Sequence, residues 1–470
     1  MPATPLPLPL PRHRTTHPAP PPNANAHPHA VAHAIPPRRR PVDAIVVGSG
    51  LAGLAVARRI ADAGLSVAVL EAADRIGGRM AGHERDGFRL DHGTLLDLDL
   101  GRDGHDGDGH DGLLDLPRLD LRSFGSEALM PRQGYRNRAG GAWNQARLAS
   151  ALSRLAATPA ERLMDRPERT TAQALAERGL LGLAPSGLAP AGLPLSGVAP
   201  EGFLRPLLVA LLGDPELGTS SRVADLALRG YARGRLRLPA QGAAAVPRQL
   251  AEALPPGTVR LGVRVTAVSA DGVETERHGR LDSRAVVIAT DARSAGDLLP
   301  GLHQPAHHPV TTYYHAAADS PSPGPEPRLL LDAERGGLVS YSLVLSEVDR
   351  SYAPAGAALI ATTVLGRRCF DAGGPASLEP SVRRRLAVLY GADTSGWGFL
   401  AVRHLPDALP AMPPPHHFHR PVRVLHGLYV CGDHRETGNA GGALASGRRA
   451  AAAVLRDLGL PVVPGADLAA

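Results

Sequence analysis

The chain contains no lysine, because all 51 of its basic residues are arginine. This absence excludes a lysine Schiff base and any catalytic water held by a lysine. Such a preference for arginine, with abundant alanine, glycine and proline, indicates a GC-rich genome more than a particular chemistry. Cysteine is scarce too, since Cys369 and Cys431 are too few for a disulfide framework. We therefore expect a reducing, cytoplasmic setting.

Long apolar runs are also missing. A membrane-spanning helix needs roughly 18 consecutive apolar residues, and the nearest approach, Leu204–Leu212, is interrupted by Arg205 and Pro206. We expect no transmembrane segment, while peripheral contact with a membrane stays open.

The positive charge is concentrated at the start of the chain. The formal net charge is +6, and Arg12, Arg14 and Arg38–Arg40 supply five positive charges within residues 1–41, which hold no Asp or Glu. The remainder is nearly neutral and gives no basis for a nucleic-acid partner. With thirteen prolines, five histidines and no apolar run, residues 1–41 are predicted to be a disordered extension and not a secretory signal.

Two low-complexity inserts interrupt the rest of the chain. The pentapeptide Asp-Gly-His-Asp-Gly is repeated at residues 103–112, and a Pro/Gly-rich five-residue pattern fills residues 184–203. The first matches neither an EF-hand nor a glycine-rich calcium repeat, and the second is too short for a solenoid. Both are predicted to be surface loops, as is the segment His416-His417-Phe418-His419 after a proline run. No metal site is expected.

Between the inserts, buried-strand patterns alternate with helical ones. Val42–Val47 and Ser66–Leu70 are predicted strands flanking a predicted helix at Leu51–Ala63, which together make a βαβ unit. Helices are also predicted within Leu204–Leu228 and at Val246–Leu254 and Gly442–Leu458, and strands at Val259–Val268, Ala285–Ala289, Arg328–Leu331, Leu338–Leu345 and Ala357–Val364. The predicted class is α/β, a discontinuous Rossmann-like domain interleaved with an α+β domain on a largely antiparallel sheet.

The first predicted strand runs into a glycine pattern that can hold a dinucleotide. Gly48 permits a tight turn, Gly50 lets backbone approach a diphosphate, and Gly53 lets the helix pack on the strand. The helix N-terminus then presents free N–H groups and a positive dipole end to the phosphates. Glu71 closes the second strand, where a carboxylate can accept both hydroxyls of an adenosine ribose, and an acid there disfavours a 2′-phosphate.

A second glycine-rich segment lies near the other end of the sequence. Tyr429-Val430-Cys431-Gly432-Asp433 reads as a strand and turn, and Gly441-Gly442-Ala443 open a predicted helix. Alone, this segment is typical of any glycine-rich loop before a helix. Paired with the N-terminal pattern it predicts a larger cofactor, FAD, with the two segments converging on one molecule.

These motifs identify a resemblance. The Gly48–Gly53 turn, Glu71, Arg75-Ile76-Gly77-Gly78-Arg79 and the closing Gly432-Asp433…Ser446-Gly447 resemble those of the FAD-dependent amine oxidase, phytoene desaturase and protoporphyrinogen oxidase superfamily. Within it the chain is most similar to NAD(P)/FAD-dependent oxidoreductases of unassigned substrate. The resemblance covers about residues 42–460, apart from the inserts.

The resemblance implies a set of FAD contacts. Arg79 would approach the diphosphate or the flavin edge, Val265 would hold the adenine through its backbone, and Asp433 would bind the ribityl chain or approach the diphosphate. N–H groups at the start of the last helix would face the flavin. The implied cofactor-binding set is Gly48, Gly50, Leu51, Ala52, Gly53, Glu71, Gly77, Gly78, Arg79, Val265, Gly432, Asp433, Gly441, Gly442 and Ala443.

The chain departs from the amine oxidases proper, in which a lysine lies near the flavin and a tyrosine closes an aromatic cage. Here lysine is absent, Asn439 stands where that tyrosine would be, and aromatic residues are 3% of the chain. We therefore expect an apolar or bulky organic substrate that gives a hydride to flavin N5, with reoxidation by oxygen, a quinone or another acceptor. The catalytic candidates are His434, Glu436 and Asn439, with His92 and Arg435 as further neighbours of the reaction centre.

Three alternatives stay open at this point. An NAD-dependent dehydrogenase would use only the N-terminal pattern, a non-redox binder resembling the GDP-dissociation inhibitors would keep the fold without flavin, and a flavin-dependent isomerase would need no terminal acceptor. We expect an FAD-binding domain from residues 42–115, 236–298 and 420–465. The substrate domain is expected from residues 116–235 and 299–419.

Overall fold

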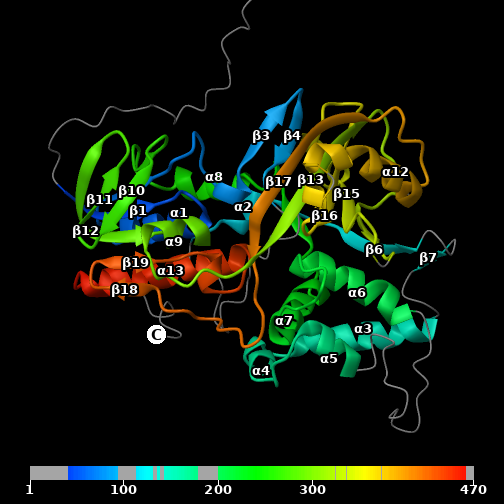
Figure 1. Ribbon diagram of the computed structural model, residues 1–470, viewed down its shortest axis with the longest axis horizontal. Coiled ribbons are helices and arrows are strands. Elements are labelled where there is room, and N and C mark those ends of the chain that lie inside the picture. Colours follow the sequence, from blue (N-terminus) through cyan, green and yellow to red (C-terminus); the bar gives the residue numbers. More distant parts are fainter. Residues whose placement is uncertain are drawn as a thin grey trace, which may run out of the picture.

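The computed structural model describes residues 41–93, 113–130, 135–137, 142–177, 199–322, 324–334, 336–371 and 373–461. Two sheets lie side by side along the long axis, with a helical layer beneath the second (Figure 1). The N-terminal extension to residue 40, the repeat at 103–112 and residues 184–198 of the Pro/Gly-rich insert lie outside the described residues. Within the described part, no helix is both long and apolar enough to cross a bilayer.

The first sheet is a Rossmann-like parallel core. Its path runs β10-β11-β12-β1-β2-β9, and β19 pairs in parallel with β12. The inner strands are almost purely apolar, as a sheet covered on both faces requires. The strand bounds are β1 Val42–Val47, β2 Val67–Leu70, β9 Val259–Arg260, β10 Val265–Ser269, β11 Gly272–Thr275, β12 Gly279–Ile288, β18 Arg423–Leu425 and β19 Leu428–Val430.

Helices cover both faces of this sheet. On one face, α1 (Leu51–Asp62), α8 (Ala245–Glu252) and α13 (Ala440–Asp457) share an apolar core with Val46 and Val287. On the other face, α9 (Ala292–Leu298) and the β10–β11 hairpin pack against Ile45 and Val286. Because side chains alternate between the two faces along β1 and β12, successive residues of each strand pack into two separate cores.

The second sheet has the order β17-β13-β16-β15-β14-β6-β7 and is antiparallel except where β6 pairs with β14. Strand β17 is the longest and runs from this sheet toward the first one (Figure 1). The strand bounds are β6 Gly125–Met130, β7 Tyr135–Asn137, β13 His307–Ala317, β14 Arg328–Asp332, β15 Tyr341–Val344, β16 Ala358–Leu365 and β17 Gly398–Pro410.

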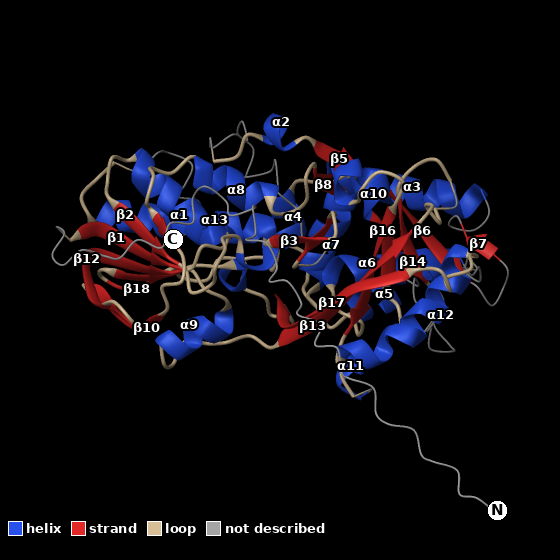
Figure 2. Cartoon of the chain, turned by 90° about the horizontal axis from the view of Figure 1, so that it is seen from above, coloured by secondary structure: helices blue, strands red, loops and turns tan. Residues whose placement is uncertain are grey.

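The second sheet is also covered on both faces. Tyr314 on β13 faces a core shared with α6 and α7, whereas its neighbour Tyr313 faces a core shared with α12. The helices of this half, seen from above in Figure 2, are α3 Ala142–Ala157, α4 Ala160–Met164, α5 Thr171–Glu177, α6 Ala199–Leu212, α7 Ser221–Ala232, α10 Leu345–Val348, α11 Arg368–Asp371 and α12 Glu379–Tyr390.

Short elements connect the two halves. A hairpin of β3 (Gly82–Arg85) and β4 (Phe88–Asp91) follows the 3-10 turn η1 (Gly78–Met80), and β5 (Leu121–Ser123) pairs with β8 (Arg237–Pro239) after α2 (Leu116–Leu119). The remaining 3-10 turns are η3 Arg350–Tyr352, η4 Pro375–Leu378 and η5 Asp433–Arg435.

The predicted class and most predicted elements are confirmed, and one strand is wrong. The single strand expected at Val259–Val268 is two strands, β9 and β10, in different parts of the sheet. Gly262 adopts φ +71 between them, and this left-handed turn ends the first strand. Strands β13 and β17 form the edge of the second sheet nearest the first. Their extents were not predicted, although the sequence favours buried sheet positions for Tyr313 and Tyr314, and both are fully buried in β13.

The N-terminal and C-terminal glycine segments lie close together, as predicted. β12 lies between β1 and β19, so the C-terminal glycine segment follows a strand only one place removed from the N-terminal one. Gly447 of α13 packs so closely on α1 that a Cβ there would lie 3.1 Å from the Ala55 Cβ and press into the Ala52 carbonyl. Glycine is needed at this position because the two helices cross at backbone contact.

Candidate functional site

The turn after β1 has the geometry that a diphosphate requires. Gly48 adopts φ +103, and a Cβ there would lie 2.9 Å from the Ala289 carbonyl oxygen. A Cβ on Gly53 would fall onto the Gly48 carbonyl, so the helix can pack on the turn only with glycine. At Gly50, the N-cap of α1, a Cβ would meet nothing within 4 Å. There is therefore space beside Gly50 at the start of α1, where a helix leaves its first N–H groups without intrahelical partners.

Glu71 is fixed beside this turn. One carboxylate oxygen accepts hydrogen bonds from the Ser49 N–H and the Ser49 hydroxyl, both at 2.8 Å. The other oxygen accepts from the Ala73 N–H at 2.9 Å. The Glu71 carbonyl in turn accepts from Val263 N–H at 2.8 Å, which brings the start of β10 at Val265 to the same end of the sheet. This placement suits a carboxylate that binds an adenosine ribose.

The second glycine pair folds back over the first. Gly77 and Gly78 adopt φ +104 and +55, and the Gly77 N–H donates to the Ser49 carbonyl at 2.9 Å. A Cβ on Gly78 would lie 3.6 Å from the Gly50 Cα, so the two glycine segments form one cradle.

Arg79 connects this cradle to distant parts of the chain. Its Nη2 lies 2.7 Å from Oδ2 of Asp433, which is buried in η5. Its Nη1 donates to the Ala408 carbonyl of β17 at 2.6 Å. One guanidinium therefore touches the N-terminal motif, the C-terminal motif and the second sheet. The sequence predicted that Arg79 and Asp433 would both lie near the cofactor, but it predicted neither their ion pair nor the contact with β17.

The C-terminal segment leaves polar atoms at this junction without partners. Gly432 adopts φ +147, and its N–H donates to the Ser446 hydroxyl of α13 at 3.1 Å. The His434 ring packs against Gly432, and both of its nitrogens are buried without a hydrogen-bond partner in the described structure. Burial, opposed by Asp433, lowers the pKa of His434 to about 4, so the imidazole is neutral at pH 7. Such unpaired buried nitrogens fit a site that a bound polar cofactor completes.

Asn439 caps α13 at the same junction. Its Oδ1 accepts from the Gly442 N–H at 2.7 Å, and the Ala443 N–H donates to the Asn439 carbonyl at 2.9 Å. The N–H groups of Gly442 and Ala443 are therefore engaged within the protein, and those of Ala440 and Gly441 start the first turn. This refines the expectation that Gly442 N–H would face a flavin, because Asn439 takes that bond.

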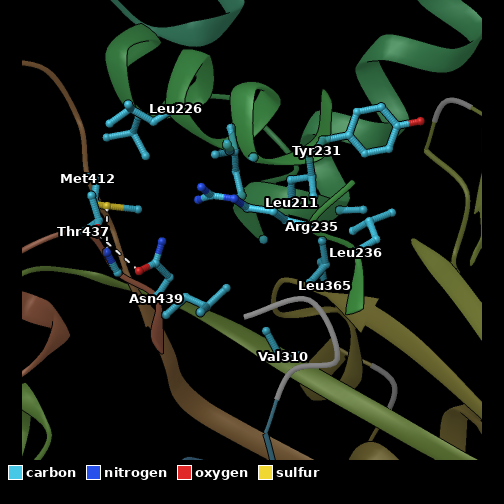
Figure 3. A pocket seen from close by; sticks show the side chains of 18 of the residues that line it. Leu211, Leu226, Tyr231, Arg235, Leu236, Val310, Leu365, Met412, Thr437 and Asn439 are labelled. Atoms are coloured by element: carbon cyan, nitrogen blue, oxygen red, sulfur yellow. Dashed lines mark hydrogen bonds between the residues drawn. The ribbon is translucent and has the colours of Figure 1, made fainter. Parts of the chain in front are cut away.

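A cavity of about 110 Å³ opens beside Asn439 (Figure 3). Side chains from α6, α7, β13, β16 and β17 surround it, and most are aliphatic. Among the described lining residues, Arg235 is the single charged one, and Tyr231 and Tyr341 are the aromatic ones. The lining comprises Ala210, Leu211, Leu212, Gly213, Val223, Leu226, Ala227, Gly230, Tyr231, Arg235, Leu236, Val310, Tyr341, Leu365, Leu409, Met412, Thr437, Gly438 and Asn439.

Of the three catalytic candidates, only Asn439 lines this cavity. His434 lies on the cradle side, near Asp433 and Arg79. Glu436 is buried, and its carboxylate lies 2.6 Å from Arg449 Nε and 3.0 Å from His419 Nδ1. The structure thus places the three candidates in three different environments.

The surface loop predicted at residues 416–419 is wrong for His416. This residue is 8% exposed, and its N–H donates to Glu168 at 2.9 Å. Burial lowers the pKa of His416 to about 4. The loop packs behind the C-terminal motif, where His419 pairs with Glu436. Sequence reasoning missed it because the burying partner, Glu168, is remote in sequence.

A parallel sheet with a glycine turn suited to a dinucleotide, beside a second sheet and an apolar cavity, is the arrangement of a dinucleotide-binding oxidoreductase. Comparison with known families agrees. The family model described as flavin containing amine oxidoreductase matches residues 150–455, and that of the NAD(P)-binding Rossmann-like domain matches residues 46–99. The chain belongs to the flavin containing amine oxidoreductase family. It is an FAD-dependent oxidoreductase, as the paired motifs predicted.

Individual relatives extend this result. The chain is 28% identical over 458 residues to a hydroxysqualene dehydroxylase of Rhodopseudomonas palustris, covering 87% of this chain and 97% of that protein. A phytoene desaturase of Neurospora crassa is 49% identical over 59 residues, so the match spans only 10% of that relative. Among solved structures, a putrescine oxidase variant superposes with a TM-score of 0.63 at 19% identity, covering 88% of this chain and 99% of that one. The similarity to the putrescine oxidase, at this identity, shows a shared fold.

Proposed function

We propose that this flavoenzyme oxidises an apolar, bulky organic molecule held in the cavity between α7 and Asn439. The observation that carries the proposal is the lining, which is aliphatic on most sides and ends at the N-terminus of α13 beside the cofactor cradle. When bound, FAD supplies a hydride acceptor at N5. Oxygen, a quinone or another acceptor would then reoxidise it.

The cofactor-binding set is proposed from the cradle. Gly48, Gly50, Leu51, Ala52 and Gly53 would hold the diphosphate at the open start of α1. Glu71 and Val265 would hold the adenosine, and Arg79 would neutralise phosphate charge while it stays bound to Asp433. Gly77, Gly78, Gly432, Asp433, Gly441, Gly442 and Ala443 would shape the remainder of the cradle.

The chamber suits the removal of hydride from carbon more than amine chemistry. Among the described residues that line it, there is no carboxylate or histidine that could accept a proton from an ammonium group. Its side chains exclude water and align the substrate, and positioning alone can supply several kcal/mol of a barrier. Asn439 would position the substrate by its amide, because its Oδ1 is already fixed by the Gly442 N–H.

His434 and Glu436 would act as positioning residues. Neutral His434 can donate one hydrogen bond and accept another from a bound cofactor, which would satisfy both buried nitrogens. Glu436, tied to Arg449 and His419, would hold the segment that carries Thr437 and Asn439 in register with the cavity.

The substrate class that we favour is a long isoprenoid-like hydrocarbon or alcohol. The full-length relative named hydroxysqualene dehydroxylase supports this choice. So does a lining with two aromatic residues, which differs from an aromatic cage built for amines. The domain division that we propose is 42–115, 236–298 and 420–465 for FAD and 116–235 and 299–419 for substrate.

The test is anaerobic bleaching of the flavin absorbance. Purified holoenzyme would be mixed with isoprenoid alcohols, carotenoid precursors, porphyrinogens and primary amines in parallel. We expect bleaching with an isoprenoid and none with amines. Bleaching by amines alone would overturn the proposal. Conversion of every active compound without consumption of an electron acceptor would also overturn it, in favour of an isomerase. A colourless protein that takes up NAD and not FAD would point to the nicotinamide alternative.

A further inference from the structure

Two histidines and an arginine converge where the β3–β4 hairpin meets β17. His83 Nδ1 of β3 lies 3.0 Å from His92 Nε2, which follows β4. Arg403 of β17 places Nη2 3.0 Å and 3.1 Å from the two nitrogens of the His83 ring. Arg85 of the same hairpin donates to the Leu400 carbonyl, so the hairpin is docked on β17 (Figure 1).

Within the part of the chain that the structure describes, Arg403 has no carboxylate partner. Near-equal distances to both His83 nitrogens put the guanidinium over the ring, out of line with either lone pair. Arg403 Nε is buried and has no hydrogen-bond partner in the described residues. A partly buried guanidinium without a carboxylate is costly, and proteins normally pair it.

The neighbouring charges are mostly of the same sign. Arg75 and Arg85 both act on His83, and Arg75 also acts on His92. The nearby acid, Asp74, is engaged by Arg75 at 2.8 Å. Side chains of His83, His92 and Arg403 are each partly exposed, so the cluster is open to a solute. The described residues therefore present several N–H donors and excess positive charge at one point, and among them only Asp74, which is engaged by Arg75, is acidic.

We propose that His83, His92 and Arg403 form a binding site for a phosphate group. Donors reach it from two sides, the hairpin and β17, as a multiply charged oxoanion requires. The FAD diphosphate would occupy another place, because its cradle is built from Gly50, Gly78 and Arg79. The phosphate would belong either to a free metabolite or to the head of an amphiphilic substrate.

The titration behaviour of the histidines agrees with such a site. Burial, then Arg403 and His83, lower the pKa of His92 to about 4, and burial followed by Arg403 lowers that of His83. A bound phosphate would reverse the charge effect and raise both pKa values. Its binding therefore takes up protons, and the affinity increases as the pH falls from 8 toward 6.

The test is phosphate binding to the FAD-saturated protein, so that the cofactor cradle is filled. Inorganic phosphate is titrated against potassium chloride of equal ionic strength, and binding is followed by calorimetry and by the imidazole carbon-bound proton resonances. Arg403→Gln should weaken binding at least about tenfold, the loss typical of one charge-assisted hydrogen bond, and His92→Gln should reduce the pH dependence to the part that His83 contributes. Arg284→Gln, which removes an exposed arginine paired with Asp43, is the matched control and should bind like wild type.

The same variants separate folding from binding. Without phosphate, Arg403→Gln should keep or raise the melting temperature, because it removes an unpaired cation. Equal phosphate affinity in wild type and Arg403→Gln, or equal stabilisation by chloride, would overturn the site. Glycerol phosphate and geranyl phosphate then distinguish the sources, since a metabolite site binds both alike and a substrate-head site prefers the geranyl ester.

Discussion

Arg79 and Asp433, which belong to motifs at opposite ends of the described sequence, form a 2.7 Å ion pair. The Asp433 side chain is 5% exposed and that of Arg79 is 31% exposed. The acid is therefore desolvated, and the arginine stays open on one side to a ligand. This pair closes the cradle that the two glycine segments form.

Arg79→Gln should weaken FAD binding at least about tenfold and destabilise the cofactor-free protein by about 1–3 kcal/mol, because a buried carboxylate loses its partner. FAD affinity would be measured by flavin fluorescence and stability by urea unfolding. The double variant Arg79→Gln/Asp433→Asn should regain much of the stability and none of the affinity. Additive losses of stability in the double variant would show that the pair is not coupled.

Gly50→Ala and Gly53→Ala should differ sharply although they lie three residues apart. A Cβ at Gly50 meets nothing within 4 Å, so the fold should tolerate it while FAD affinity falls. A Cβ at Gly53 would press into the Gly48 carbonyl, and overpacking of this kind costs about 1–3 kcal/mol or more. Melting curves and FAD titrations check both variants. Equal thermal stability of the two would contradict the helix contact described at Gly53.

Leu226→Trp should obstruct the cavity without disturbing the cofactor. Leu226 lines the chamber on α7 and takes no part in the cradle. We expect the KM for an apolar substrate to rise about tenfold, the effect of about 1.4 kcal/mol, with an unchanged flavin spectrum. Val388→Trp, on the exposed side of α12, is the control. A wild-type KM in Leu226→Trp would show that the substrate binds outside this cavity.

Asp91 should make stability depend on pH. Burial raises its pKa to about 6, opposed by a 2.6 Å hydrogen bond from the Tyr352 hydroxyl and one from the Ala243 N–H. Between the ordinary value of 3.8 and about 6, the folded state holds a proton that the unfolded state has lost. The contribution of this group to stability is therefore full below pH 4 and falls by about 3 kcal/mol as the pH rises through 6.

Asp91→Asn should remove that dependence, because an amide can keep both contacts in uncharged form. Unfolding free energies measured from pH 4 to 7.5 would show the difference between the two proteins. Parallel pH curves would mean that Asp91 ionises with its ordinary pKa.

The cofactor cradle could be predicted from sequence because its geometry is local. Gly48, Gly50 and Gly53 act through one turn and one helix start, and Glu71 follows the next strand. The cavity could not be predicted, since Leu226, Val310 and Met412 come from elements that only the tertiary fold assembles. Periodicity within Leu204–Leu228 predicted helices there but not what their buried faces enclose.

Polar residues caused most of the errors. Strand β13 carries three histidines and two threonines among its eleven residues, so its extent could not be predicted beyond the tyrosine pair Tyr313-Tyr314, yet His315 and Thr311 are fully buried. His416 was misplaced for a related reason, because its burial depends on Glu168. Pairing with distant partners lets polar residues enter a core, and a sequence pattern does not display those partners.

The contact of Gly447 with Ala52 has a consequence for biosynthesis. The ribosome makes α1 and the first glycine turn early, and α13 only after almost every other described residue has emerged. Until then the nascent chain contains only the N-terminal part of the proposed FAD site. We therefore expect FAD to bind only after α13 has left the exit tunnel, and we expect a nonsense mutation upstream of α13 to weaken flavin retention.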